Sequence, residues 1–232
     1  MLLLPSAAAK ALAEFETVRE AWATLRDAGT RHVAALGNAK QEATYVGGHA
    51  GATMGARAGA AEEEDKAAPV ESARRRALEQ CRAAQRKEHE KLCGIVRQMA
   101  SLVARMSAAR DALRKRWNEL REERLLRQEE EKEEEEGEGG GGGSDVDGDA
   151  TAVGVTWTAR DLLHALGTII ESFRTELFLK ASIVEDVVHQ SDPDVMLSYS
   201  AAFLSEPYLA EDAIFSKLEA AKYELKLLLR SK

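Results

Sequence analysis

Two residues of this sequence have the spacing of metal ligands, because His89 and Cys93 lie four apart and would share one face of a helix. An imidazole and a thiolate could supply half of a tetrahedral zinc site. The sequence offers no second pair at such a spacing, and its other histidines are scattered at His32, His49, His164 and His189. We therefore expect no bound metal, and interpret the pair as a surface histidine beside a core cysteine.

Acidic residues offer two further kinds of chemistry. Three alternating aspartates between 145 and 149 resemble the start of a calcium loop, but the glutamate that closes such a loop is missing. The carboxylates of Asp192, Asp194 and Glu206 could act as general acid and base, yet their positions around a proline-bounded segment are more typical of helix caps. The sequence contains no Gly-x-x-x-x-Gly-Lys phosphate loop. We expect no catalytic residue, no cofactor and no enzymatic activity.

The elements that carry these residues are expected to be helices. Only 5% of the 232 residues are aromatic, four are prolines, and Ala, Leu, Glu and Arg are abundant. No stretch approaches the length of an apolar membrane span, and the short apolar run at residues 1–5 lacks the basic residues of a signal peptide. Two cysteines in one expected helix, Cys81 and Cys93, fit a reducing compartment. These features favour a soluble, intracellular protein.

Charge is distributed unevenly along the chain, whose net charge is −8. Residues 129–149 contain eight Glu, three Asp and one Lys, whereas residues 71–128 contain 16 Lys or Arg and eight acidic residues. A basic helix followed by an acidic tract could bind nucleic acid or an acidic partner and be masked by the tract. A solvated helix beside a disordered linker explains the same pattern, and is the more common case.

Apolar periodicity divides the chain into three helical parts and two linkers. In residues 70–130 the apolar positions recur three and four apart, with a slip to four and four near Leu113 and Trp117, as in a coiled coil with a stutter. This stripe must be covered by the N-terminal helix, by the C-terminal helices or by another protein. We predict an all-α, elongated helical bundle or coiled coil with two disordered low-complexity linkers. Its segments are an N-terminal helical segment (6–43), a Gly/Ala/acidic linker (44–69), a long basic coiled-coil helix (70–130), an acidic Gly-rich linker (131–155) and a C-terminal helical region (156–232).

Local signals set several helix ends. Gly29 could end a first helix, with Thr30 capping a second; one continuous helix with a costly glycine is the alternative. Thr158 with Asp161 resembles a capping box. Asp192 and Pro193 have the residue types of an N-cap and a first helical position. Large aromatics near these breaks could be core anchors or interface anchors, namely Trp22, Trp157 and Tyr208.

Two blocks of the sequence resemble the cyclin-dependent kinase 2-interacting protein family. The first block is Trp22-Ala23-Thr24-Leu25-Arg26-Asp27-Ala28-Gly29. The second comprises Thr156-Trp157, Glu176-Leu177-x-Leu179-Lys180, Asp192-Pro193-Asp194-x-x-Leu197-Ser198-Tyr199 and Pro207-Tyr208. The sequence departs from the vertebrate pattern in its longer linkers, in a longer helix after Tyr208 and in Phe203, which stands where a tryptophan is typical.

The resemblance implies a non-enzymatic adaptor subunit of an AAA+ ATPase assembly. Such an adaptor acts in maturation of the large ribosomal subunit, in DNA replication and in genome stability, including the DNA-damage checkpoint. The implied partners are AAA+ ATPase subunits, a small helical partner protein, cyclin-dependent and Dbf4-dependent kinases and the ATR-interacting protein. The implied location is the nucleus, including the nucleolus, and in part the cytoplasm. The hypothesised partner-binding residues are Trp22, Leu25, Asp27, Gly29, Trp157, Phe173, Glu176, Leu177, Lys180, Asp192, Pro193, Asp194, Leu197, Tyr199, Pro207 and Tyr208.

Two alternatives remain open at this stage. One is a nucleic-acid-binding module that uses the basic central helix, through Arg74-Arg75-Arg76 and Arg114-Lys115-Arg116. These runs lack interleaved aromatics, so base-specific recognition is not expected. The other is a structural homodimeric coiled coil built on the stripe of the central helix.

Overall fold

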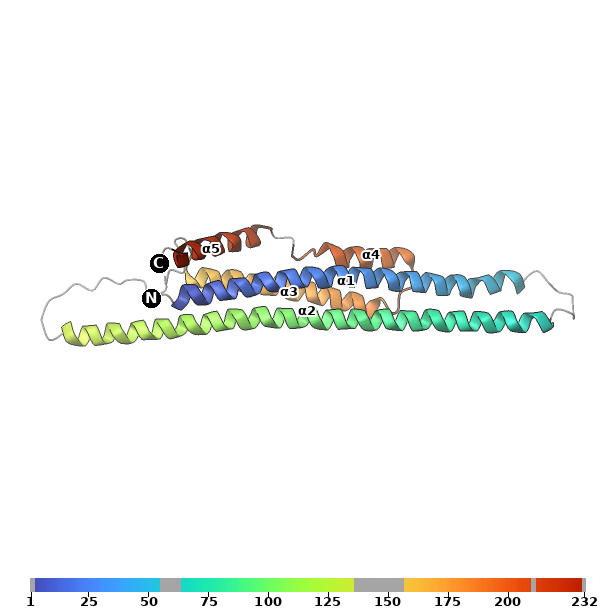
Figure 1. Ribbon diagram of the computed structural model, residues 1–232, viewed down its shortest axis with the longest axis horizontal. Coiled ribbons are helices and arrows are strands. Elements are labelled where there is room, and N and C mark those ends of the chain that lie inside the picture. Colours follow the sequence, from blue (N-terminus) through green and yellow to red (C-terminus); the bar gives the residue numbers. More distant parts are fainter. Residues whose placement is uncertain (1–2, 55–63, 136–156, 210–211, 231–232) are drawn as a thin grey trace. The chain divides into compact units, whose positions relative to one another are not determined.

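The described residues of this computed structural model, 3–54, 64–135, 157–209 and 212–230, are helical apart from short turns. The described part of the chain contains five helices, in the order α1 (Leu3–Met54), α2 (Glu64–Glu135), α3 (Ala159–Asp186), α4 (Pro193–Ser205) and α5 (Asp212–Arg230) (Figure 1). The all-α prediction is confirmed. Within the described residues, no helix combines the length and the apolar character needed to cross a membrane.

The chain forms two compact units, and α1, α2 and α3 each contribute to both. The first unit contains Met1–Ala21, Ser101–Thr175 and Tyr208–Lys232. Its core collects apolar side chains from four helices, and α5 is tied to α1 by an ion pair between Lys222 and Glu16. The buried side chains include Leu12, Phe15 and Val18 of α1, Leu102, Met106 and Leu113 of α2, Leu166, Ile170 and Phe173 of α3, and Leu218 and Leu225 of α5.

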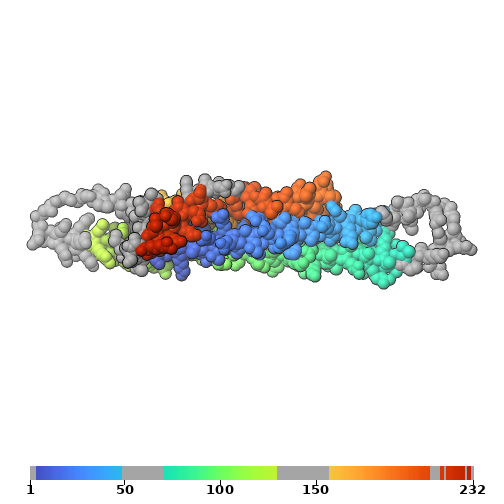
Figure 2. Space-filling model, turned by 45° about the horizontal axis from the view of Figure 1, so that its top comes forward, coloured from blue at the N-terminus to red at the C-terminus, as the bar shows by residue number. Residues whose placement is uncertain are grey.

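The second unit contains Trp22–Ala100 and Glu176–Pro207. In this unit α4 lies along α1, as the ribbon and the space-filling view both show (Figures 1 and 2). Its core again draws on four helices, in the spacing expected of amphipathic helices. The buried apolar side chains are Trp22, Val33 and Leu36 of α1, Cys81, Leu92, Ile95 and Met99 of α2, Ile183 and Val184 of α3, and Met196 and Phe203 of α4.

The apolar stripe of the central helix is therefore covered by the chain itself. Leu92 and Met99 are fully buried in the second unit, and in the first unit Met106 is fully buried and Leu113 almost so. The sequence left open whether the N-terminal helix, the C-terminal helices or another protein covers this stripe. For these residues the cover is provided by the chain's own helices.

The structure extends the expected helices into the segments read as linkers. Helix α1 continues past residue 43 to Met54, and α2 begins at Glu64 and ends at Glu135. Helix α1 thus occupies residues 44–54 of the expected 44–69 linker and α2 occupies residues 64–69, whereas 55–63 and 136–156 lie outside the described residues. One reason for the longer α1 is a tertiary contact, because Arg74 of α2 donates hydrogen bonds to the carbonyls of Val46 and Gly47. These carbonyls belong to a glycine-containing stretch with low intrinsic helix propensity.

Helix α1 also runs without interruption through Gly29, so the continuous alternative holds. Thr30, considered as a cap for a second helix, instead donates its hydroxyl to the Arg26 carbonyl one turn earlier, at 3.0 Å. A threonine that bonds back within its own helix does not end it.

The predicted caps of α3 and α4 are confirmed. The Thr158 hydroxyl accepts a hydrogen bond from the Asp161 backbone N–H at 3.1 Å, and the Asp161 carboxylate accepts one from the Thr158 backbone. The Asp192 side chain accepts from the Asp194 N–H at 2.9 Å, with Pro193 as the first helical residue. These short-range signals fix where both C-terminal helices begin.

Candidate functional site

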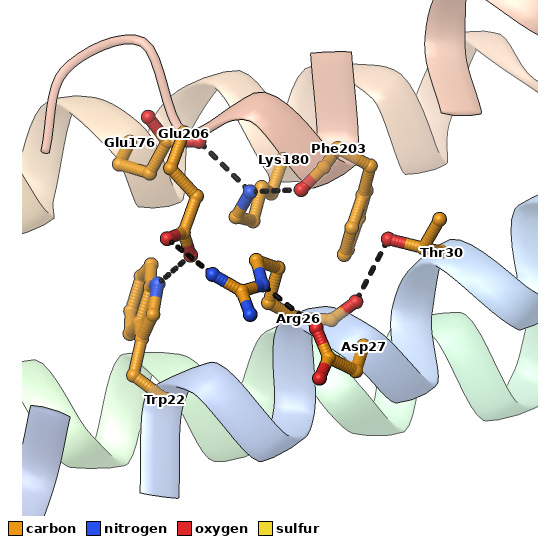
Figure 3. Close-up of polar contacts among 8 residues, drawn as sticks. All are labelled: Trp22, Arg26, Asp27, Thr30, Glu176, Lys180, Phe203 and Glu206. Atoms are coloured by element: carbon orange, nitrogen blue, oxygen red, sulfur yellow. Dashed lines mark hydrogen bonds and ion pairs between the residues drawn. The ribbon is translucent and has the colours of Figure 1, made fainter. Parts of the chain in front are cut away.

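The C-terminal end of α4 is anchored on α1 by a single carboxylate. Glu206, the residue that ends α4, has a φ of 47°, which is left-handed backbone. A non-glycine residue there costs roughly 1–2 kcal/mol. Its carboxylate accepts hydrogen bonds from Trp22 Nε1 at 2.7 Å and from Arg26 Nη1 at 3.0 Å (Figure 3). These charge-assisted bonds offset the strain and hold the end of α4 against α1.

Arg26 connects this carboxylate to a second one on α1. Its Nε donates to Asp27 at 2.8 Å. The hydrogen bond to Asp27, together with the negative charge of Glu206, raises the pKa of the Arg26 guanidinium. The arginine therefore stays charged, and two acidic groups share one partly buried cation.

A fully buried ion pair on α3 supports the same end of α4. Lys180 and Glu176, one helical turn apart, have no exposed surface, and their charged atoms lie 2.8 Å apart. Lys180 Nζ also donates to the Phe203 carbonyl at 2.6 Å and lies 4.6 Å from the centre of the Phe203 ring (Figure 3). The ammonium thus satisfies one of the last carbonyls of α4, which have no partner within their own helix.

Small residues on α1 allow α4 to approach closely. A Cβ built on Gly29 would lie 2.2 Å from Phe203 Cε1, and one on Gly37 would lie 3.4 Å from Met196 Cε. Phe203 is completely buried and Met196 nearly so. The inner face of α4 therefore packs against two glycines of α1, while Lys180 and Glu206 fix its end.

The outer face of α4 carries apolar side chains that no other described residue covers. Pro193, Leu197, Ala201 and Leu204 follow one another four, four and three residues apart, which places them on one side of the helix. All four are exposed, with 70% of Leu197 and 51% of Leu204 accessible to solvent. We call these four residues the α4 outer face.

The structure separates the sequence-predicted partner-binding residues into three groups. Some serve the chain's own packing, because Trp22, Gly29, Phe173, Glu176 and Lys180 are buried. Leu25, Trp157, Leu177 and Tyr199 are half-buried. The exposed members are Asp27, Asp192, Pro193, Asp194, Leu197, Pro207 and Tyr208. Most of the set comes together around α4 in the second unit, whereas Trp157, Phe173 and Tyr208 belong to the first unit.

Sequence reasoning missed Arg26 and the role of Glu206. It weighed Glu206 as a general acid or base and as a helix cap, whereas the carboxylate accepts hydrogen bonds from side chains 184 and 180 positions away. One signal was present: Trp22 and Arg26 lie four apart, so two side-chain donors share one helix face and favour a common acceptor. The spacing does not indicate which carboxylate supplies that acceptor, because this depends on the tertiary structure.

His89 and Cys93 lie close together on α2 and both are half-buried, so the expected surface histidine beside a core cysteine is not what the structure shows, and the aspartates between 145 and 149 lie outside the described residues. His89 Nε2 lies 3.6 Å from Cys93 Sγ and 3.2 Å from the Val184 carbonyl. Among the described residues, no group of three or more His, Cys, Asp or Glu side chains comes together as a metal site.

The basic runs considered for nucleic acid are partly engaged within the chain. Arg74 binds the carbonyls near the end of α1, and Arg76 bonds Ser72 within α2. Arg116 pairs with Glu119 at 2.7 Å. Arg74 and Arg116 are half-buried, whereas Arg75, Arg76, Arg114 and Lys115 are exposed.

Comparison with known proteins gives one partial similarity. No family model matches the chain. Over 58 residues it is 33% identical to the human cyclin-dependent kinase 2-interacting protein, a match that covers 25% of this chain and 27% of the human protein. The chain thus spans about a quarter of the length of the relative it matches, and this distant similarity agrees in kind with the resemblance drawn from the motifs.

Proposed function

We propose that this protein is a non-enzymatic adaptor that presents the α4 outer face to a partner protein. The single observation that carries the proposal is the contrast between the two sides of α4. One side is locked onto the chain by Phe203 and Met196, whereas Leu197 and Leu204 on the other are exposed. A row of exposed apolar side chains on a firmly held helix is a common recognition element, because a partner's apolar groove can bury the whole row.

The resemblance supplies the class of partner. The human protein is named for an interaction with cyclin-dependent kinase 2, and the family resemblance points to an AAA+ ATPase assembly. We propose that the α4 outer face binds a subunit of such an assembly. The adaptor would act in maturation of the large ribosomal subunit and in DNA replication within the nucleus. Association with cyclin-dependent or Dbf4-dependent kinases and with the ATR-interacting protein would occur through the same assembly.

Capture from the protein's own cells tests this proposal. The intact chain and a Leu197→Ser/Leu204→Ser variant are used as baits, and the recovered proteins are identified by mass spectrometry. We expect the intact chain to recover an AAA+ ATPase and the variant to lose it. Both substitutions lie at exposed positions, so the helical circular dichroism of the two baits should be equal.

A matched control changes two exposed apolar residues of α5 instead. Tyr223 is 64% and Leu227 50% exposed, and Tyr223→Ser/Leu227→Ser removes comparable surface elsewhere. This control should retain the ATPase. Equal recovery by the Leu197/Leu204 variant and the intact chain would rule out the α4 outer face as the docking site, and failure of the intact chain to recover any AAA+ ATPase would refute the choice of partner.

A further inference from the structure

A cavity of about 180 Å³ lies in the second unit, apart from the α4 outer face. It is formed by α1, α2 and the turn between α3 and α4, and is lined by Leu36, Lys40, Arg82, Gln85, Arg86, His89 and Val188. Drug-sized ligands and cofactors occupy pockets of roughly 300–1,000 Å³. The cavity is too small for these, and its volume equals about six waters at ~30 Å³ each, which suits a single side chain of a partner.

The charged groups around the cavity are all of one sign. Lys40, Arg82 and Arg86 line it, and no carboxylate does so among the residues that the structure describes. Arg82 and Arg86 lie four apart on α2, so both guanidinium groups leave the same helix face. Neither forms an ion pair or hydrogen bond with any other described residue. Two adjacent, unpaired arginines beside a cavity favour an anionic ligand.

Lys40 gives the cavity a fixed positive wall. Its ammonium donates hydrogen bonds to the carbonyls of Val188, at 2.7 Å, and Gln190. These bonds hold the turn between α3 and α4 in place, and burial lowers the pKa of Lys40. Gln85 is similarly fixed, since its amide donates to the Ala39 carbonyl at 3.1 Å. The cavity is therefore lined both by side chains held in place by hydrogen bonds, Lys40 and Gln85, and by the exposed Arg82 and Arg86.

The cavity also has an apolar lining. Its apolar side chains are Leu36, which is almost fully buried, and Val188, which is 45% exposed. A ligand that fits must therefore combine negative charge with an adjoining apolar group. A free inorganic anion would leave these two apolar side chains uncovered, whereas a peptide in which a glutamate or aspartate adjoins a leucine would contact both the charged and the apolar lining.

We propose that this cavity binds an acidic peptide segment of a partner protein. Carboxylates of the segment pair with Arg82 and Arg86, and a neighbouring aliphatic side chain rests on Leu36 and Val188. The site does not depend on the α4 outer face, so an adaptor with both would engage two different surfaces.

The experiment uses the full-length protein and a fluorescein-labelled peptide in which glutamates flank a single leucine, with binding followed by fluorescence anisotropy. Arg82→Glu/Arg86→Glu should weaken binding about tenfold, because two exposed charge pairs are lost and replaced by repulsion. The matched control, Lys87→Glu/Arg121→Glu, makes the same change of charge at exposed positions outside the cavity, and should alter binding less than about twofold. Val188→Ser should weaken binding without changing its dependence on salt.

Three results would overturn the proposal. The first is equally tight binding of a peptide with glutamine in place of every glutamate. The second is an equal loss of binding in the two double variants, which would mean that the cavity has no special role. Alternatively, a single-stranded oligonucleotide of the same charge displaces the peptide, and both double variants weaken its binding equally. That last outcome would mean a general basic surface for nucleic acid.

Discussion

Gly29 provides a sharp test of how α4 is held. Replacing it with alanine should lower the stability of the protein, whereas the same change at an ordinary helical glycine raises it. Replacing glycine with alanine inside a helix normally stabilises a protein by about 0.5–1 kcal/mol. At Gly29 the new methyl group would lie 2.2 Å from Phe203 Cε1 and 2.6 Å from Cζ. Phe203 is fully buried beside the Lys180 ammonium, so its ring is enclosed by neighbouring atoms and can move away only if they also shift.

The magnitude follows from these two opposing effects. Forcing a methyl group into a packed core costs typically 1–3 kcal/mol, and a 2.2 Å contact with a buried ring belongs at the upper end of that range. After the gain in helix propensity, Gly29→Ala should lower the free energy of unfolding by about 1–2 kcal/mol. In a chain of this size that is a fall in Tm of roughly 2–8 °C.

Gly94 is the matched control in the same unit. It lies within α2, and no atom is within 4 Å of the position of its Cβ. Gly94→Ala should therefore raise Tm by about 1–4 °C. Both variants are measured by thermal and urea unfolding followed by circular dichroism. In a Phe203→Leu background, where the ring is gone, Gly29→Ala should cost much less. Equal stabilisation by Gly29→Ala and Gly94→Ala would refute the close packing of α4 on α1.

Three further predictions concern buried charge, pH and capping. Lys180→Met should lower the free energy of unfolding by about 3–5 kcal/mol, because it leaves Glu176 charged and buried without its ion-pair partner; adding Glu176→Leu should recover much of this loss in urea unfolding. The hydrogen bond from Lys91 lowers the pKa of Glu88 below 4.5. Its contribution to stability is therefore complete above that pH and lost as pH falls through the lower folded-state pKa, so Glu88→Gln should flatten the dependence of Tm on pH in that acidic range. Thr158→Ala removes the acceptor of the hydrogen bond at the start of α3 and should cost about 1 kcal/mol, read from the midpoint of urea unfolding.

Local features of the fold were predictable because they depend on neighbouring residues. The caps at Thr158 and Asp192 each involve atoms two or three residues apart, and the structure shows both. The amphipathic stripe of α2 follows from spacing alone, and Leu92 and Met106 are fully buried as the pattern predicted. All of these signals lie within a few turns of one helix.

The arrangement around α4 was not predictable in the same way. The low helix propensity of Gly29 favours a helix end. Only the close approach of Phe203, far along the chain, explains why a position inside α1 holds a residue without a side chain. Glu206 likewise gains its partners from α1. In both cases the deciding contact joins distant segments, which a sequence pattern does not place side by side.

The division of the motif residues between core and surface decides which variants can test the adaptor function. Trp22, Glu176 and Lys180 are buried and hold α4 to α1 and α3, so changing them would loosen the helix and lose a partner indirectly. Loss of binding in such a variant would say nothing about docking. Leu197 and Leu204 are exposed on the other side of α4, and changing them leaves the anchoring contacts intact. If a variant loses the partner while its stability is unchanged, the loss can be assigned to the α4 outer face. If binding and Tm fall together, the loss is assigned to the contacts that hold α4 in place.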